Sequence, residues 1–169
     1  VSFIAFTQQC IKKLLGAFLF LTVSLGAQET HVRWSQDSKK VSHCEYDLIF
    51  TAKIDRYYHI FSIVPSGDSR PTIFEFTPSD SYQLVGKMKE PKPHRIDDEI
   101  MGVLLEHHGP GAVSFTQRIK LLTDKKVTVK GKFEYQECDT VACNFPPMED
   151  FAFTLSGSPQ CAKSTPTVP

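Results

Sequence analysis

Two closely spaced cysteines are the residues of this chain best suited to chemistry. Cys138 and Cys143 lie in the segment FEYQECDTVACNFPP, with four residues between them, and Pro146 and Pro147 follow. Consecutive prolines cannot continue a regular backbone ladder, so we expect a strand end, a tight loop and a stop. Such a turn can bring two Cα atoms within the roughly 4.4–6.8 Å that a disulfide needs. The spacing therefore permits a disulfide between Cys138 and Cys143.

The short loop between Cys138 and Cys143 indicates whether a disulfide there would mainly stabilise the fold or would open and close. Closing it removes about 2 kcal/mol of chain entropy from the unfolded state, against more than about 4 kcal/mol for a loop of roughly 100 residues. A purely stabilising bridge would sensibly join distant strands, so the spacing favours a pair that opens and closes. It is not a thioredoxin site, which has two intervening residues at a helix N-terminus. A structural hairpin disulfide is the alternative, and a zinc site is disfavoured because no second close cysteine pair exists.

The first 27 residues have the pattern of an export signal. Lys12 and Lys13 precede an apolar run over 14–25, and the small residues Gly26 and Ala27 follow. This run of about 12 residues is shorter than the roughly 20 that span a bilayer as a helix. We expect residues 1–27 to be a secretory signal peptide, with cleavage after Gly26 or an uncleaved anchor as alternatives. The localisation expected is the periplasm.

The remaining sequence is long enough for one domain, about 140 residues. We assign 28–155 to this domain and 156–169 to a linker or disordered tail, because the tail is small, polar and rich in proline. The chain has 19 basic and 19 acidic residues, so it lacks the basic excess of a nucleic-acid binder. No pattern indicates a bound cofactor or metal.

Apolar alternation predicts an all-β domain. Even positions are apolar from Cys44 to Ile54, which is typical of a strand with one buried face. Short runs at this spacing predict an antiparallel sandwich or barrel. The polar, proline-interrupted stretch 90–99 is expected to be a long surface loop. The other expected strands lie within 32–35, 57–63, 72–76, 82–87, 113–121, 127–135 and 151–155.

The pattern also makes predictions for individual cysteines. After removal of the signal, four cysteines permit three full pairings in an oxidising compartment, and the sequence does not choose among them. Cys44 is expected on a buried strand face as a small apolar residue. Cys161 is assigned no role in the tail, and a Cys44–Cys161 pair has no support from the pattern. Parity along the strand that contains Tyr135 places Cys138 on its outward side.

Three segments resemble the N-terminal periplasmic domain of DsbD, the transmembrane thiol–disulfide reductase, in its Bacteroidetes-like form. The segment 135–147 is similar to that family's cysteine hairpin, with a Tyr-Gln-x-Cys opening and paired prolines after the second cysteine. The segment 98–102, Asp-Glu-Ile-Met-Gly, is similar to its cap loop, and 55–62 to the aromatic strand beside its site. The resemblance covers about 32–155.

The resemblance implies an immunoglobulin-like β-sandwich that carries electrons as part of a protein-disulfide reductase. A thioredoxin-like partner domain would reduce it, and it would reduce disulfide isomerases or cytochrome c maturation thioredoxins. A membrane electron-transfer domain of the same protein is a further implied partner. Cys143 would form mixed disulfides and Cys138 would resolve them. The cap loop would comprise Asp98, Glu99, Ile100, Met101 and Gly102, and the site wall would comprise Tyr58, His59, Phe61 and Phe145.

Within the cap, Ile100 and Met101 would shield the sulfurs until a partner displaces them, and Asp98 and Glu99 would tune thiol protonation. The sequence departs from the family in having four residues between the cysteines instead of five. In the family an aromatic residue directly follows the second cysteine, whereas here Asn144 lies between Cys143 and Phe145. The cap has Ile100 at the position where the family usually has an aromatic residue. The family's membrane and thioredoxin-like domains are not within the 169 residues, so we expect this sequence to be the head of a longer protein or a stand-alone relative.

Other functions have weaker support. An immunoglobulin-like adhesion module would keep the Cys138–Cys143 disulfide permanently oxidised and bind its partner through loops. A metal site would use His107 and His108, but adjacent histidines in a loop are usually solvated. A hydrolase is disfavoured because no nucleophile-elbow motif is present.

Overall fold

Alternating apolar residues build the larger sheet of the fold. The computed structural model describes residues 30–67, 69–98 and 103–162. The sheet has the antiparallel order β1-β2-β8-β5, and the even positions of β2 are buried as the alternation predicts. Leu48 and Phe50 of β2 and Phe115 of β8 are fully buried. The strands are β1 (Val32–Lys40), β2 (Glu45–Ile54), β5 (Tyr82–Lys89) and β8 (Gly111–Leu121).

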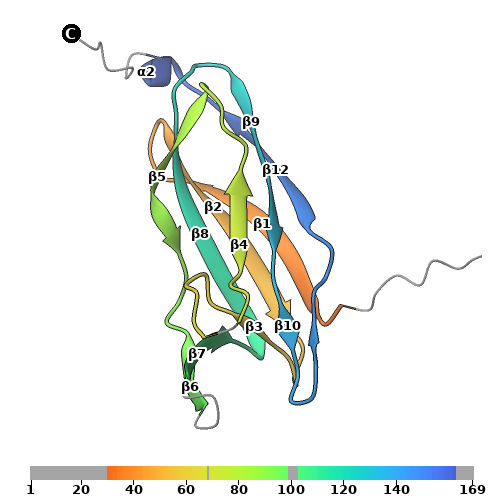
Figure 1. Ribbon diagram of the computed structural model, residues 1–169. Helices are drawn as coiled ribbons and strands as arrows, with labels where there is room; N and C mark the ends of the chain where they lie inside the picture. The colour runs from red at the N-terminus through yellow and green to blue at the C-terminus, as the bar shows by residue number, and fades with distance from the viewer. Residues whose placement is uncertain (1–29, 68, 99–102, 163–169) are drawn as a thin grey trace, which may run out of the picture.

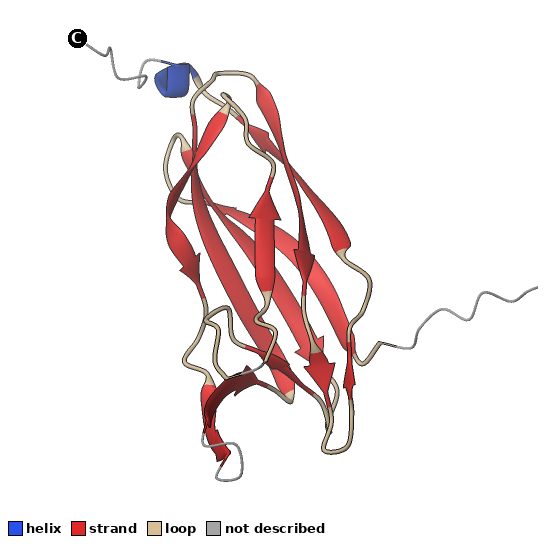
Figure 2. Ribbon diagram, viewed as in Figure 1, coloured by secondary structure: helices blue, strands red, loops and turns tan. Residues whose placement is uncertain are grey.

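A second antiparallel sheet covers the apolar face of the first. It has the order β12-β9-β4, with β4 (Ile73–Phe76), β9 (Lys126–Glu134) and β12 (Glu149–Ser156). The ring of Phe50 packs against Phe74 and Phe151 of this sheet, with centroids 4.7 and 4.9 Å apart. Two sheets closed over a shared aromatic core form the expected immunoglobulin-like β-sandwich, shown in Figures 1 and 2.

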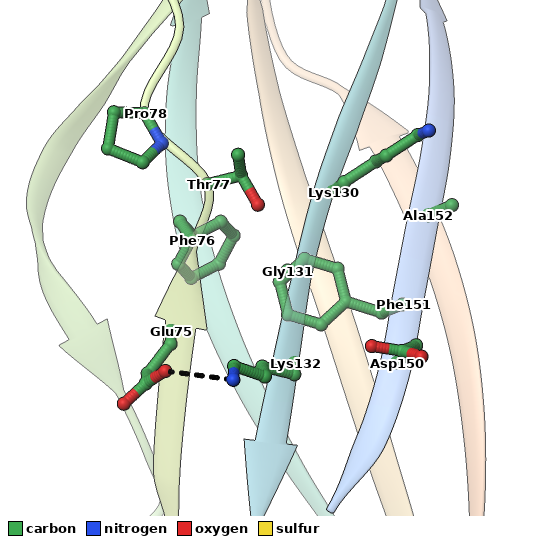
Figure 3. A pocket seen from close by; sticks show the side chains of 10 residues that line it. All are labelled: Glu75, Phe76, Thr77, Pro78, Lys130, Gly131, Lys132, Asp150, Phe151 and Ala152. Atoms are coloured by element: carbon green, nitrogen blue, oxygen red, sulfur yellow. Dashed lines mark ion pairs between the residues drawn. The ribbon is translucent and has the colours of Figure 1, made fainter.

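A glycine in β9 allows close approach within the second sheet. A Cβ atom at Gly131 would collide with the Glu75 carbonyl oxygen and the Phe151 ring. Figure 3 shows this ring extending across Gly131, inside a groove of about 790 Å³ that is also lined by Lys130 and Lys132. The groove contains neither Cys138 nor Cys143, so it is separate from the cysteine site.

A third sheet, built of short strands and called the small sheet below, lies at one end of the sandwich (Figure 1). Its order is β11-β10-β3-β7-β6, and the pairs are antiparallel. The sheet therefore joins the cysteine hairpin to strands from two other parts of the chain. Its strands are β3 (His59–Phe61), β6 (His94–Asp98), β7 (Val103–His108), β10 (Glu137–Cys138) and β11 (Cys143–Asn144).

Two of these strands differ from the sequence-based expectation. The stretch 90–99 is not wholly a surface loop, because His94–Asp98 forms β6 and pairs with β7. Within the described residues β6 pairs with one neighbour only, and such edge strands accept polar side chains. The adjacent histidines are not in a solvated loop either, since both belong to β7 and His108 is 4% exposed.

The C-terminal segment is also more ordered than expected. The stretch 156–162 is not a frayed linker, because Gly157 N donates to Lys125 O and the short helix α2 (Pro159–Ala162) follows. Cys161 on this helix is fully buried and forms a disulfide with Cys44, with Cα atoms 5.4 Å apart. Cys44 is buried as predicted, but it is paired. The domain therefore extends past 155 to the covalently attached helix.

Several expectations concern residues outside those described. They are the signal peptide at 1–27, the cap residues Glu99, Ile100, Met101 and Gly102, and the final segment 163–169. Among the residues that the structure describes, no helix is long and apolar enough to cross a membrane.

Candidate redox-active disulfide

Cys138 and Cys143 form a disulfide across a short hairpin. They are direct register partners in the β10–β11 pair, and their Cα atoms are 4.0 Å apart. Asp139 closes the turn, because its Oδ1 accepts the backbone N–H groups of Val141 at 2.7 Å and Ala142 at 2.8 Å. The N–H groups of Ala142 and Val141 hold the pKa of Asp139 below its usual range. The turn is therefore stabilised by a charge-assisted side-chain contact.

The two sulfur-bearing residues have opposite exposure. Cys138 is 2% exposed, whereas Cys143 is on the surface. The parity argument that placed Cys138 outward is wrong, because the chain passes from the second sheet into the small sheet after Glu134 and alternation is not maintained. A thiolate approaching from solvent can therefore reach Cys143 more readily than Cys138.

A side-chain amide contacts the buried sulfur. Gln136 Nε2 donates to Cys138 Sγ at 3.5 Å, and Gln136 Oε1 accepts the Arg70 backbone N–H at 2.8 Å. The Arg70 guanidinium lies over the Phe145 ring, with Cζ 4.8 Å from its centroid. The segment containing Arg70 thus supports both sides of the hairpin. An N–H donor at Cys138 Sγ would stabilise a thiolate at that position.

A fully buried carboxylate lies on the opposite face of β10. Glu137 Oε2 accepts hydrogen bonds from the Thr30 hydroxyl at 3.2 Å and the His31 backbone N–H at 3.1 Å. The His31 ring stacks on Tyr58 with centroids 3.8 Å apart. These contacts fasten the start of β1 to the hairpin, so residues distant in sequence determine where the cysteines lie.

The expected wall residues occupy different positions relative to the cysteine hairpin. His59 is the register partner of Cys138, and Phe61 follows two positions later on the same face of β3. Phe145 follows β11 and is 50% exposed. Tyr58 precedes β3 and stacks on His31. The structure thus gathers His59, Phe61 and Phe145 around the small sheet, whereas Tyr58 contacts the chain start.

The cap segment is attached to the same sheet as the disulfide. Asp98 is the last residue of β6, and its register partner Val103 begins β7. The other cap residues lie outside the described residues. β7 pairs with β3, which in turn pairs with β10, so a continuous set of strands connects the β6–β7 hairpin to Cys138.

A buried polar cluster holds the base of the β6–β7 hairpin. Glu90 Oε2 accepts His108 Nε2 at 2.8 Å and the Ile63 backbone N–H at 3.1 Å, and Glu90 Oε1 accepts the Ser62 hydroxyl at 2.6 Å. Burial by itself would raise the pKa of Glu90, but the hydrogen bonds from His108, Ser62 and Ile63 outweigh it and lower that pKa. The cluster joins the ends of β3, β5 and β7.

We expect Glu90→Gln to lower the free energy of unfolding by about 2 kcal/mol at neutral pH, because it replaces a carboxylate that accepts three donors. Since the folded-state pKa lies below the ordinary value of 4.5, this stability is present above that pH and is lost as the pH falls through the folded value. Urea denaturation of both proteins across this range should show their difference shrinking on acidification.

Glu75→Gln is the matched control for Glu90→Gln, because the Glu75 side chain is 60% exposed and 4.0 Å from Lys132 Nζ. Its cost should stay within about 0.5 kcal/mol. Equal costs for the two variants, or a difference that does not depend on pH, would contradict the assigned role of Glu90.

Sequence reasoning missed several residues around the disulfide. Gln136 could have been found, because it precedes Cys138 by only two residues and belongs to the Tyr-Gln-x-Cys opening of the hairpin. Asp139 could also have been found, because Asp commonly caps a turn through backbone N–H groups. Arg70 and His107 come from other strands and loops, and no local pattern predicts their position.

Comparison with solved structures places the fold among known domains. The chain superposes on the N-terminal periplasmic domain of ScsB from Proteus mirabilis with a TM-score of 0.52 and 17% identity, over 83% of this chain and 56% of that one. The two share a fold. This chain therefore spans a little over half of the ScsB structure.

A second similar structure is the reduced N-terminal domain of DsbD from Neisseria meningitidis, with a TM-score of 0.44 and 18% identity. That alignment covers 73% of this chain and 85% of the DsbD domain. No protein-family model matches the sequence, and no curated protein sequence matches it.

Proposed function

We propose that this domain exchanges electrons with thioredoxin-like proteins through reversible opening of the Cys138–Cys143 disulfide. The observation that carries the proposal is the unequal exposure of a hairpin disulfide: Cys143 is on the surface, and Cys138 is 2% exposed. A structural bridge needs no such asymmetry. A carrier needs it, because one sulfur must accept attack while the other leaves and later returns.

The exchange reaction requires only the two hairpin cysteines and one partner dithiol. A partner thiolate attacks Cys143 Sγ, a new partner–Cys143 S–S bond forms, and Cys138 Sγ leaves with the electron pair and takes up a proton. The second partner thiolate then attacks its own sulfur in the mixed disulfide and releases Cys143. The domain gains two electrons and the partner is oxidised. In reverse, Cys138 attacks Cys143 Sγ and a partner is released reduced.

Three features support this role. Gln136 Nε2 donates to the sulfur that would leave. The exposed side chains of Val141 and Phe145, 90% and 50% exposed, provide apolar surface on either side of Cys143 in sequence. The hairpin and cap segments resemble those of DsbD N-terminal domains.

We also propose where this domain is located and which proteins it exchanges electrons with. We place the domain in the periplasm after removal of a signal peptide, because the sequence has that pattern and the similar ScsB domain is described as periplasmic. Its donor would be a thioredoxin-like protein or a membrane electron-transfer domain of the same protein. Its acceptors would be disulfide isomerases or cytochrome c maturation thioredoxins.

A redox titration of each disulfide tests the proposal. The protein is equilibrated in thiol–disulfide buffers, alkylated, and analysed by peptide mass spectrometry so that Cys138–Cys143 is resolved from Cys44–Cys161. We expect the hairpin disulfide to titrate between about −120 and −270 mV, the range of thiol–disulfide carriers. Resistance to reduction below about −300 mV would favour a structural bridge in an immunoglobulin-like binding module instead.

A further inference from the structure

Histidines from three strands share one face of the small sheet with Cys138. His59 is directly opposite Cys138 in the β3–β10 pair, and opposite residues of an antiparallel pair point to the same face with Cβ atoms about 5 Å apart. His107 lies opposite Phe61, and His94 lies opposite His107. The ring centroids of His59 and His107 are 4.9 Å apart, and those of His107 and His94 are 5.7 Å apart.

The buried position of Cys138 creates a need for a proton acceptor. In the resolving step the Cys138 thiol must lose its proton before it can attack Cys143 Sγ, because the thiolate is the nucleophile. With 2% of its surface exposed, Cys138 has little access to water that could take this proton. A neighbouring side chain is therefore better placed to accept it.

Among the described residues, His59 is the titratable group best placed for this task. Directly before β10, Gln136 contributes an amide, which donates but does not titrate. The Asp139 carboxylate is already engaged by two backbone N–H groups. On β7, His108 points to the other face and bonds to Glu90. His107 and the exposed His94 lie one and two strands beyond His59.

Burial keeps this imidazole neutral. Burial lowers the pKa of His59 below its ordinary value of 6.5, against the opposing influence of the Asp139 carboxylate. Burial is the main cause that lowers the pKa of His107 to about 4, and the nearby His59, His94 and His108 contribute to the same shift. A proton on His107 would repel one on His59. At neutral pH, His59 is thus a free base that can accept a proton.

We propose that His59 is the general base that deprotonates Cys138 when Cys138 resolves a mixed disulfide. The inference rests on the proposed exchange function. The imidazole nitrogen takes the thiol proton, and Cys138 Sγ attacks Cys143 Sγ. The Cys138–Cys143 bond forms, and the partner sulfur leaves with the electron pair. The imidazolium then returns its proton to solvent. In the opposite direction the same group protonates the departing Cys138 thiolate.

The reaction of the reduced protein with equimolar 5,5′-dithiobis(2-nitrobenzoate) separates the two steps. Attack by Cys143 releases the first thionitrobenzoate, and resolution by Cys138 releases the second. We expect His59→Gln to slow the second release by about 100-fold or more and to leave the first unchanged. The wild-type rate of the second release should level off above the His59 pKa. In the variant it should keep rising until the Cys138 thiol itself ionises.

His43→Gln is the matched control, because His43 is exposed and lies beside the other disulfide. It should leave both releases and their pH dependence as in the wild type. If His59→Gln shows the wild-type rate and pH profile for the second release, the inference is wrong. Absence of the first release from reduced wild-type protein would instead contradict the exchange function itself.

Rescue by imidazole separates loss of a base from altered packing. In His59→Ala, added imidazole should accelerate the second release in proportion to its unprotonated form, whereas the first release should not change. Packing defects are not repaired by a soluble base. A slowed second release that imidazole does not accelerate would contradict the role of His59.

Discussion

Cys143→Ala is expected to abolish mixed-disulfide formation, whereas Cys138→Ala is expected to accumulate it. Of the two hairpin cysteines, Cys143 is the exposed one. Removing it leaves the thiol of Cys138, which is 2% exposed in the oxidised domain and poorly reachable by a partner sulfur. We expect the rate of adduct formation to fall by roughly 10³-fold or more, as when a nucleophile is removed from an enzyme. Cys138→Ala keeps the reachable sulfur and lacks the one that releases the partner.

The measurement uses a thioredoxin-like protein activated as an aromatic mixed disulfide at its exposed cysteine. Adducts are followed on non-reducing gels and identified by mass spectrometry, and capture from periplasmic extract with Cys138→Ala then identifies natural partners. Cys44→Ala/Cys161→Ala is the control, because it removes the other disulfide and should still exchange. Adducts that form equally well with Cys143→Ala would show that the exposure difference does not direct the attack.

Replacing Cys44 and Cys161 together by alanine is expected to lower the free energy of unfolding by about 5 kcal/mol. This disulfide joins residues separated by 117 positions, and a longer closed loop removes more conformational entropy from the unfolded chain. It also attaches α2 to the start of β2, where both cysteines are at most 8% exposed. We therefore expect this bridge to be the structural one.

Urea denaturation of the oxidised proteins measures the effect, and Cys138→Ala/Cys143→Ala is the comparison. That pair is separated by 5 positions, so its loss should cost only about 2 kcal/mol. The ordering of the two costs is the decisive result. If the hairpin variant proves the less stable of the two, the division into a structural bridge and a functional bridge is wrong.

Local patterns predicted the strands well where one face is buried. In β2 the even positions Leu48, Phe50 and Ala52 are all fully buried, because side chains alternate between faces with a period of two. The same reasoning failed for β6, whose polar residues suggested a loop. Edge strands need only one partner and little apolar surface, so their sequences carry a weak signal.

The alternation of side chains along the strand did not predict the exposure of Cys138. Tyr135 and Cys138 are both buried, although alternation would place them on opposite faces. The chain changes sheets between β9 and β10, so the residues before and after this change belong to different environments. Exposure at such a junction depends on which strands lie beside it. Here β3 pairs with β10, and no residue near the cysteines encodes the position of β3.

The sequence alone determined that this is a β-domain with two cysteines close enough to bond, because strand alternation and short loops are local properties. Only the tertiary structure decided that Cys138 is buried while Cys143 is exposed, and that His59 lies opposite Cys138. It also decided that Cys44 pairs with Cys161. These features arise where segments distant in sequence meet, and they depend on how the sheets pack, which no short stretch of residues specifies.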